Sequence, residues 1–196
     1  MKKGNFIVLE GIDGSGTTTH SHKLAEWIKR KNYEVVVTAE PTDSPIGKLI
    51  RSYLLSCGGS PEVHALLFAA DRAEHTQRVI EPLVKRGTIV ISDRYVESSI
   101  VYQAAEGLDI GWIESINKFA VEPDLTIFLS VDPEVALARK RKSEEKFENV
   151  ESLKKVRRIY LERAKVKEYP VVNTNRPVEI VHKEIVRCVE TLLFGA

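Results

Sequence analysis

The stretch that decides the fold spans residues 5–19 and reads NFIVLEGIDGSGTTT. Its first half is a short apolar run, which is typical of a strand buried in a parallel sheet. Its second half carries glycines at positions 11, 14 and 16, and the next residues place Leu24, Trp27 and Ile28 at helical spacing. A glycine turn between a strand and a helix directs consecutive backbone N–H groups at one spot, where the helix amino end adds partial positive charge. The stretch therefore predicts a site for an anion such as a phosphate.

The glycine loop fits a nucleotide-binding spacing, G-x-x-x-x-G-K-[ST], with one defect. Gly11 and Gly16 occupy the glycine positions and Thr18 that of the metal-binding hydroxyl, but Thr17 stands where the pattern has lysine. Threonine donates a hydrogen bond but brings no charge to a phosphate. Another cation must then reach the phosphates, or turnover is reduced, or the loop holds nucleotide without transferring phosphate. For this pattern taken alone, a glycine turn with no ligand is the alternative.

Four further apolar runs, rich in Val and Ile, alternate with longer amphipathic stretches. With the first run they predict five buried strands, at residues 5–10, 33–39, 88–92, 124–131 and 169–173. The clearest helix lies between Pro177 and Gly195, and its predicted buried face is Val178, Val181, Ile185, Val189 and Leu192. Strands joined by helices require right-handed crossovers and a doubly wound α/β sheet. The ligand site is therefore expected beyond the carboxyl ends of the strands.

The charge balance and the cysteines narrow the class of protein. Lys and Arg number 29 and Asp and Glu 28 among 196 residues. The resulting charge of +1 lacks the general footprint of a nucleic-acid or membrane-surface binder, although a local basic cleft is compatible with it. The first apolar run, Phe6–Leu9, is too short for a signal peptide or a membrane span, so we expect a cytoplasmic protein. Cys57 and Cys188 have no metal-ligand spacing and are expected to be reduced and buried.

A set of shorter motifs follows the glycine loop in a fixed order. They are Glu40-Pro41, Ile50-Arg51, LFAADRAEH at residues 67–75, Asp93-Arg94-Tyr95 with Ser98, Ser99, Tyr102 and Gln103, and Pro123-Asp124-Leu125 running into Val131-Asp132-Pro133. Together with the loop they resemble the thymidylate kinase family from about residue 5 to the final helix. The resemblance implies a P-loop NTPase fold of α/β class, with a five-stranded parallel sheet flanked by helices on both faces. It implies a single kinase domain over residues 1–196 with a short lid at about 139–149. It also implies an enzyme, usually a homodimer, that moves the γ-phosphate of ATP onto dTMP with Mg²⁺.

The resemblance assigns the phosphate donor to the glycine loop. ATP is expected to bind Gly11, Ile12, Asp13, Gly14, Ser15, Gly16, Thr17, Thr18 and Thr19. Thr18 and Asp93 are the expected ligands of Mg²⁺, with Asp93 acting through water. Arg94 can fork across phosphate oxygens of the acceptor, and Asp13 is expected to orient the acceptor and keep Arg94 in register. The alternatives are a buried Asp93–Arg94 ion pair and a turn-forming Asp13.

The helix that begins near Pro61 predicts a platform for a base. Phe68 and Arg72, at i and i+4, point the same way and set an aromatic face beside a donor fork. The resemblance assigns them to stacking on thymine and to base recognition. The alternative packs Phe68 on a neighbouring helix or a dimer mate and pairs Arg72 with a surface acid. Four apolar residues fall on a different face and are expected in the core, namely Val63, Leu66, Leu67 and Ala70.

Five more residues are assigned to the acceptor site. Tyr102 is expected to press against the deoxyribose and disfavour a 2′-hydroxyl, while Ser99 and Gln103 contact the base edge. Arg51 matches the family's contact to the acceptor phosphate, and Glu40 is expected to orient Arg51 or the acceptor. The alternatives are a helix-start cap for Ser99, an ordinary exposed arginine, and simple strand termination at Glu40.

The charge run after Asp132-Pro133 is the expected source of the missing cation. The glycine loop has no arginine, and the resemblance is to the branch of the family that takes its catalytic arginine from the lid. Arg139 and Arg141 are therefore expected to act in catalysis with Asp13 and Arg94, because a guanidinium can bridge β and γ oxygens during transfer. A solvated helix face is the alternative for this run.

The sequence departs from the family at two places. Thr17 replaces the loop lysine, and Thr42-Asp43 stand where many members carry Gly-Gly. Two other functions stay open beside a thymidylate kinase. One is a kinase of another nucleoside monophosphate, and the other is a nucleotide-binding relic with weak or no turnover because of Thr17.

Overall fold

The computed structural model describes residues 3–56, 59–139 and 149–195 of the chain. They form a sheet of five parallel strands in the order β2-β3-β1-β4-β5. The strands are β1 (Phe6–Gly11), β2 (Val35–Ala39), β3 (Ile89–Asp93), β4 (Leu125–Ser130) and β5 (Val171–Asn173). The prediction of five parallel strands is confirmed, and every observed end lies within two residues of the predicted one.

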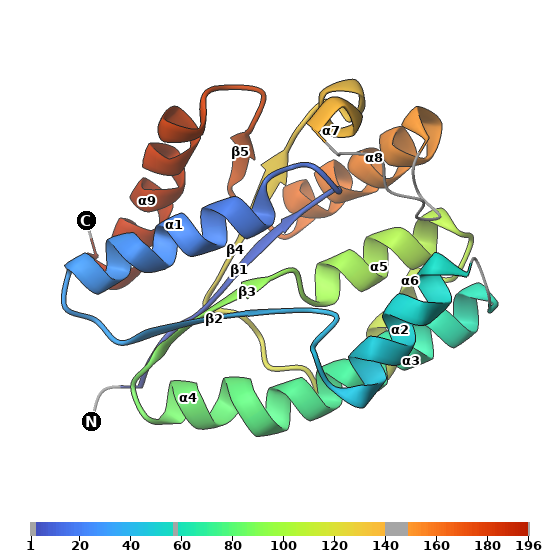
Figure 1. The fold of residues 1–196 in the computed structure, drawn as a ribbon, viewed down its shortest axis with the longest axis horizontal. Coiled ribbons are helices and arrows are strands. Elements are labelled where there is room, and N and C mark those ends of the chain that lie inside the picture. The colour runs from blue at the N-terminus through green and yellow to red at the C-terminus, as the bar shows by residue number, and fades with distance from the viewer. Residues whose placement is uncertain (1–2, 57–58, 140–148, 196) are drawn as a thin grey trace.

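Helices cover both faces of this sheet, as the resemblance implied (Figure 1). One face carries α1 (Thr17–Arg30) and α9 (Val178–Phe194), while α4 (Glu81–Lys85), α5 (Val96–Ala105), α7 (Pro133–Arg139) and α8 (Val150–Val166) pack on the other. A π-helical turn, Thr76–Ile80, leads into α4. The helices α2 (Pro45–Leu55), α3 (Pro61–His75) and α6 (Ile110–Ile116) lie together beside α5.

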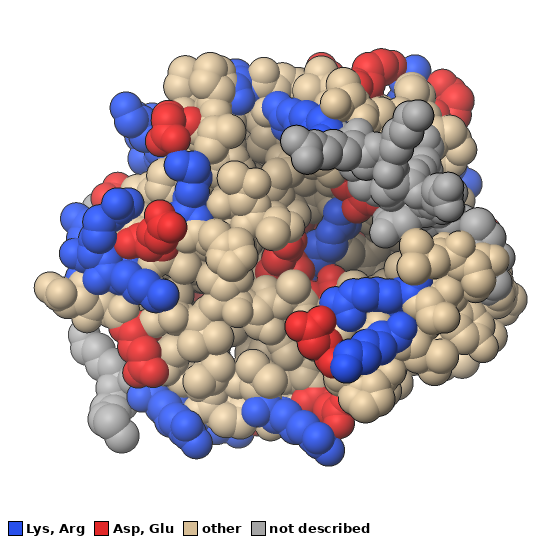
Figure 2. Space-filling model, viewed as in Figure 1, with Lys and Arg blue, Asp and Glu red and all other residues tan. Residues whose placement is uncertain are grey.

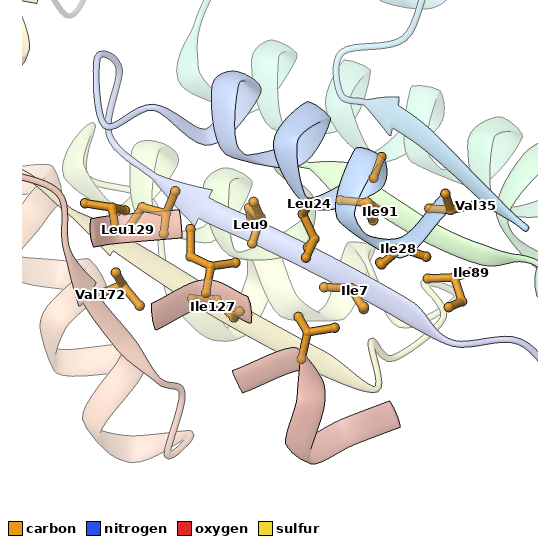
Figure 3. Close-up of a cluster of buried hydrophobic side chains, with 14 residues drawn as sticks. Ile7, Leu9, Leu24, Ile28, Val35, Ile89, Ile91, Ile127, Leu129 and Val172 are labelled. Carbon is orange, nitrogen blue, oxygen red and sulfur yellow. The ribbon is translucent and has the colours of Figure 1, made fainter. Parts of the chain in front are cut away.

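The central strand β1 divides the core between the two faces. Successive side chains of a strand point to opposite sides, so Ile7 and Leu9 face α1 and α9 while Phe6 and Val8 face α4. Leu24 and Ile28 of α1 are fully buried against the first group (Figure 3). Burial of one such side chain is worth about 1.5–3 kcal/mol. This packing fixes the start of α1, and with it the glycine loop that joins β1 to α1.

The buried face of α3 differs from the predicted one. Val63 and Leu66, expected in the core, are 37% and 51% exposed. The side chains that α3 buries are His64, Ala65, Ala69, Asp71, Arg72 and His75. The prediction was wrong because it assumed an apolar inner face. Most of the side chains on the inner face are polar, and hydrogen bonds rather than apolar contacts compensate for their burial.

The last helix follows its predicted pattern over most of its length. Val181, Ile185 and Val189 are buried against the sheet and Leu192 packs beside them, whereas Val178 at the first turn is 44% exposed. Within the described ranges, no helix combines the length and apolar character needed to cross a bilayer.

Candidate active site

The glycine loop forms the floor of a cavity of about 550 Å³, which we call the loop cavity. Gly14 and Gly16 adopt positive φ angles of 77° and 94°, which residues with a Cβ rarely adopt. A Cβ on Gly14 would also lie 2.5 Å from the carbonyl oxygen of Ala136. Gly16 caps α1 without a side-chain hydrogen bond, so the first N–H groups of α1 are left for a ligand.

Seven of the nine residues predicted to bind ATP line the loop cavity, and they run from Asp13 to Thr19. Gly11 and Ile12 do not line it. Gly11 ends β1 with its Cα close to Leu129 of β4, and the Ile12 side chain is buried in the core beside α5 and α8. These two residues shape the turn from within rather than from the cavity wall.

The positive charges at the loop cavity come from arginines of three separate elements. Arg94 follows β3, Arg139 ends α7, and Arg176 lies between β5 and α9, and no lysine lines the cavity among the described residues. The guanidinium of Arg139 donates to the carbonyl oxygens of Gly14, at 3.3 Å, and Thr174, at 2.6 Å. Arg141, the second lid arginine of the prediction, lies outside the described residues.

The two expected metal ligands lie together at the end of β3. Leu9 of β1 pairs with Asp93 of β3, which brings Asp93 to the start of α1. The hydroxyl of Thr18 donates to Oδ2 of Asp93, while the buried Oδ1 has no hydrogen-bond partner among the described residues. Hydroxyl and carboxylate oxygens suit Mg²⁺, which keeps several of its own waters. The described residues contain no group of three or more His, Cys, Asp and Glu side chains that could hold a metal ion.

Asp13, Arg94 and Tyr102 meet beside the loop. The guanidinium of Arg94 forms an ion pair with Asp13, and it lies 3.4 Å from the Tyr102 hydroxyl, which also accepts from the backbone N–H of Asp13 at 3.2 Å. Burial alone would lower the pKa of Arg94, but Tyr102 and Asp13 hold that pKa above its usual value. Burial, reinforced by the charge of Asp13, raises the pKa of Tyr102 to about 12. The arginine is therefore charged and the phenol neutral at physiological pH.

A second cavity, of about 240 Å³, lies between α3 and α5, and we call it the α3–α5 cavity. The eight residues predicted for the acceptor site all line it, namely Glu40, Arg51, Phe68, Arg72, Arg94, Ser99, Tyr102 and Gln103. Asp13 and Arg94 also line the loop cavity, so the two cavities share a wall. Figure 2 shows acidic and basic side chains meeting in a hollow over the carboxyl ends of the strands.

Comparison with known proteins places the chain in a family. The family model described as thymidylate kinase matches residues 9–185. Proteins named probable thymidylate kinase are 46% identical in Thermococcus kodakarensis (96% of this chain, 98% of that protein) and 50% identical in Pyrobaculum calidifontis (94% and 95%). Another from Pyrococcus horikoshii is 46% identical over 98% of this chain and 99% of its own length. The chain belongs to the thymidylate kinase family.

Arg72 of this thymidylate kinase family member is buried and held by several partners. It is 1% exposed and donates to Asn117, to Ser99 Oγ at 2.9 Å and to the Tyr95 carbonyl oxygen at 3.1 Å, while Glu40 Oε2 lies 2.7 Å away. The alternative of a surface acid as its partner is wrong, because Glu40 is buried. Arg72 Nε and Gln103 Oε1 are buried without a hydrogen-bond partner in the described part of the chain. Both residues line the α3–α5 cavity, so these two atoms are a candidate donor and a candidate acceptor for a ligand.

Glu40 and Arg51 do not contact each other, contrary to one sequence expectation. Glu40 binds Arg72 and also His75, whose Nδ1 lies 2.9 Å from Oε1. Arg51 donates instead to the carbonyl oxygens of Pro41 and Thr42, both at 2.6 Å. Residues 41–42 thus hold Arg51 at the rim of the α3–α5 cavity.

Asp71 explains how the loop around Thr42 keeps its shape without the two glycines common in the family. The buried Asp71 carboxylate accepts from the Thr42 N–H at 2.7 Å, the Thr42 hydroxyl at 2.5 Å and the Ser44 hydroxyl at 2.9 Å. Ser44 in turn caps α2, the helix that carries Arg51. Sequence reasoning missed Asp71, and its signal was an acid placed next to Arg72 on the same helix.

Sequence reasoning also missed residues that reach the cavities from distant segments. Thr174 and Arg176 follow β5 at the loop cavity, and their signal was their position beyond the carboxyl end of a strand. Leu54, His64 and Glu106 line the α3–α5 cavity, and no motif or spacing in the sequence marks them, whereas Pro41, which also lines it, belongs to the Glu40-Pro41 motif.

Glu10 forms a closed ring of oxygens beneath the site. Glu10 Oε2, Ser98 Oγ and Tyr160 Oη lie 2.6–3.0 Å from one another. The two hydroxyls supply two protons for three contacts, and a third proton on Glu10 would complete the ring. Burial raises the pKa of Glu10 from 4.5 to about 7, which fits a carboxyl that is partly protonated at neutral pH.

Replacement of Glu10 by Gln should remove a pH-dependent part of the stability. Between pH 4.5 and about 7 the folded protein holds a proton that the unfolded chain releases. The free energy of unfolding of the wild type should therefore fall over this range as the pH rises, by roughly 3 kcal/mol relative to Glu10→Gln.

Denaturant unfolding of both proteins at several pH values between about 4 and about 8 measures this difference. All other titrating groups are common to the two proteins and cancel in the comparison. Parallel pH profiles would contradict the shifted pKa.

Proposed function

We propose that the chain is a thymidylate kinase, which transfers the γ-phosphate of ATP to dTMP to give ADP and dTDP for dTTP synthesis. The observation that carries this proposal is the shared wall of the two cavities, formed by Asp13 and Arg94. A donor in the loop cavity and an acceptor in the α3–α5 cavity would meet at that wall. In-line phosphoryl transfer needs this arrangement, because the protein contributes mainly position and charge.

The proposed donor site is the glycine loop with its oxygen ligands. N–H groups at the start of α1 would hold the phosphates of ATP, and Thr18 and Asp93 would hold Mg²⁺. The ion, when bound, neutralises charge on the phosphate oxygens. Asp13 would keep Arg94 oriented toward the acceptor phosphate through the ion pair described above.

The proposed acceptor site reads the base by complementary hydrogen bonds. Thymine presents a carbonyl acceptor and an N–H donor along one edge, which match the unpaired Arg72 Nε and Gln103 Oε1. Phe68 offers a face for stacking, and Tyr102 would lie against the deoxyribose. Ser99 would orient Arg72, because its hydroxyl oxygen accepts a hydrogen bond from that guanidinium.

Removal of the buried acceptor oxygen of Gln103 should weaken the binding of dTMP and leave that of ATP unchanged. We expect Gln103→Leu to raise KM for dTMP by about tenfold to a hundredfold, since the base N–H would lose a partner worth roughly 1–3 kcal/mol. KM for ATP should stay unchanged. Gln77→Leu is the matched control, because Gln77 is exposed on the π-helical turn, away from both cavities. Equal effects of the two substitutions would contradict the assignment.

The charge that Thr17 lacks is proposed to come from the lid arginines. Arg139 already contacts the loop through the carbonyl oxygen of Gly14, and Arg141 follows it in the segment proposed as a lid, residues 139–149. A guanidinium delivered there would bridge the β and γ oxygens during transfer.

Replacement of these arginines should reduce turnover more than binding. In Arg139→Ala and in Arg141→Ala we expect kcat to fall by about 10³-fold, with the Kd of dTMP unchanged. Arg158→Ala is the control, because Arg158 is exposed on α8 and pairs only with Glu162 among the described residues. A wild-type kcat in both lid variants would show that another group supplies the charge.

Two rival functions are separated by one assay. The family match over residues 9–185 and the paired cavities favour a working dTMP kinase over a relic or a kinase of another nucleotide. ADP formation should be measured with ATP and Mg²⁺ against dTMP, dUMP and the other nucleoside monophosphates. Turnover with dTMP above the others is expected. Binding of ATP without ADP formation would favour the relic, and faster turnover of another acceptor would favour the related kinase.

We also propose a homodimer and a cytoplasmic location. Exposed apolar side chains of α2 and α3, among them Leu49, Val63 and Leu66, supply a surface that a second copy would cover. Light scattering should give the mass of two chains, and Leu66→Asp should shift it toward one chain. A single-chain mass for the wild type would contradict the dimer.

A further inference from the structure

Arg94 has an unfavourable backbone conformation at the wall between the two cavities. Its φ angle is 69°, in the left-handed region that a residue with a Cβ adopts only when its surroundings impose it. The side chain depends on this backbone, because a change of φ would swing the guanidinium away from Asp13 and Tyr102. The surroundings that impose the conformation therefore control where this charge lies.

The peptide group between Arg94 and Tyr95 is held at both ends. Its carbonyl oxygen accepts from the Ser92 hydroxyl at 2.7 Å, and its N–H donates to Glu10 Oε1 at 2.9 Å. The N–H of Arg94 itself donates to the carbonyl oxygen of Leu9 at 3.0 Å. Ser92 and Glu10 are both buried, so water does not compete for these bonds.

Glu10 also caps α5, whose own N-cap residue makes no capping hydrogen bond through its side chain. Tyr95 precedes the helix and makes no side-chain cap, whereas Glu10 accepts from the Ser98 N–H at 3.2 Å and from the Ser98 hydroxyl at 2.6 Å. One carboxyl group of β1 thus fixes both the 94–95 peptide and the first turn of α5. Tyr160 of α8 supports that carboxyl from the other side with a bond of 3.0 Å.

We propose that Glu10 is a positioning residue for the acceptor phosphate, and that with Ser92 it clamps the 94–95 peptide and so directs Arg94 into the α3–α5 cavity. This inference rests on the proposed dTMP site. It assigns Glu10 no contact with substrate. The clamp acts on the arginine proposed to meet the phosphate. Loss of the clamp should therefore weaken the binding of dTMP, which carries a phosphate, far more than the binding of thymidine, which has none.

Calorimetric titration of dTMP, thymidine and ADP into five proteins tests the clamp. For Glu10→Ala we expect the Kd of dTMP to rise about tenfold or more, with thymidine and ADP changed by less than about threefold. Glu10→Gln should restore dTMP binding to within about threefold, because the amide oxygen still accepts from the Tyr95 N–H. Ser92→Ala should act like Glu10→Ala but more weakly. Ile28→Val, a core change on the buried face of α1, is the control for lost stability alone.

A double-mutant cycle completes the test. When Arg94 is already Ala, Glu10→Ala should cause no further loss of dTMP affinity, because the group that the clamp directs is gone. Equal losses for thymidine and dTMP, or additive losses in the cycle, would reduce Glu10 to a structural role and overturn the proposal. If Glu10→Ala does not fold, wild-type dTMP affinity in Ser92→Ala overturns it as well. A wild type that binds no dTMP would remove the proposed function and this inference together, whereas normal dTMP affinity in folded Glu10→Ala removes the clamp alone.

Discussion

The pairing of β1 with β3 is the constraint on which the site depends. Their register sets Leu9 opposite Asp93, so the glycine loop after β1 and the Asp93-Arg94 pair after β3 emerge side by side. A shift of one residue would turn Asp93 to the other face of the sheet and separate it from Thr18. Apolar packing of Ile7, Leu9 and Ile91 under α1 fixes this register, and among the described residues no side chain of the site belongs to that apolar cluster (Figure 3).

Loss of the loop lysine changes how charge is supplied to the loop cavity. A lysine is a flexible point charge that works from one position, whereas an arginine fork needs a fixed plane to be useful. Carbonyl oxygens provide that fixing here. The carbonyl oxygens of Gly14 and Thr174 accept hydrogen bonds from Arg139. The carbonyl oxygen of Asn173 accepts from Arg176, which also pairs with the carboxylate of Glu184. Besides Arg94 after β3, the cavity thus obtains its cations from near the ends of α7 and β5, two elements far from the loop in sequence.

The sequence was sufficient for the sheet and for most of the cavity walls, because both follow from local patterns. Apolar runs marked the five strands, and the Phe68–Arg72 spacing marked one wall. The face of α3 could not be predicted by counting apolar residues, since its inner side holds Asp71, Arg72 and His75 in hydrogen bonds. Glu10 was missed for a related reason. Its partners are Tyr95, Ser98 and Tyr160, and only the fold brings such distant positions together.

The α3–α5 cavity separates a neutral end from a charged end. At the end proposed for the base, Glu40 lies 2.7 Å from Arg72 with both side chains buried, so the pair carries no net charge. At the other end, the ion-pair partner of Arg51 in the described part of the chain is the exposed Asp43 at 3.4 Å, where water screens the attraction. Arg94 at this end is paired with Asp13, while Glu10 and Asp71 act through backbone groups and add no ion pair to Arg94 or Arg51. Such a cavity would suit the proposed acceptor, with the neutral base beside Arg72 and the phosphate beside Arg51 and Arg94.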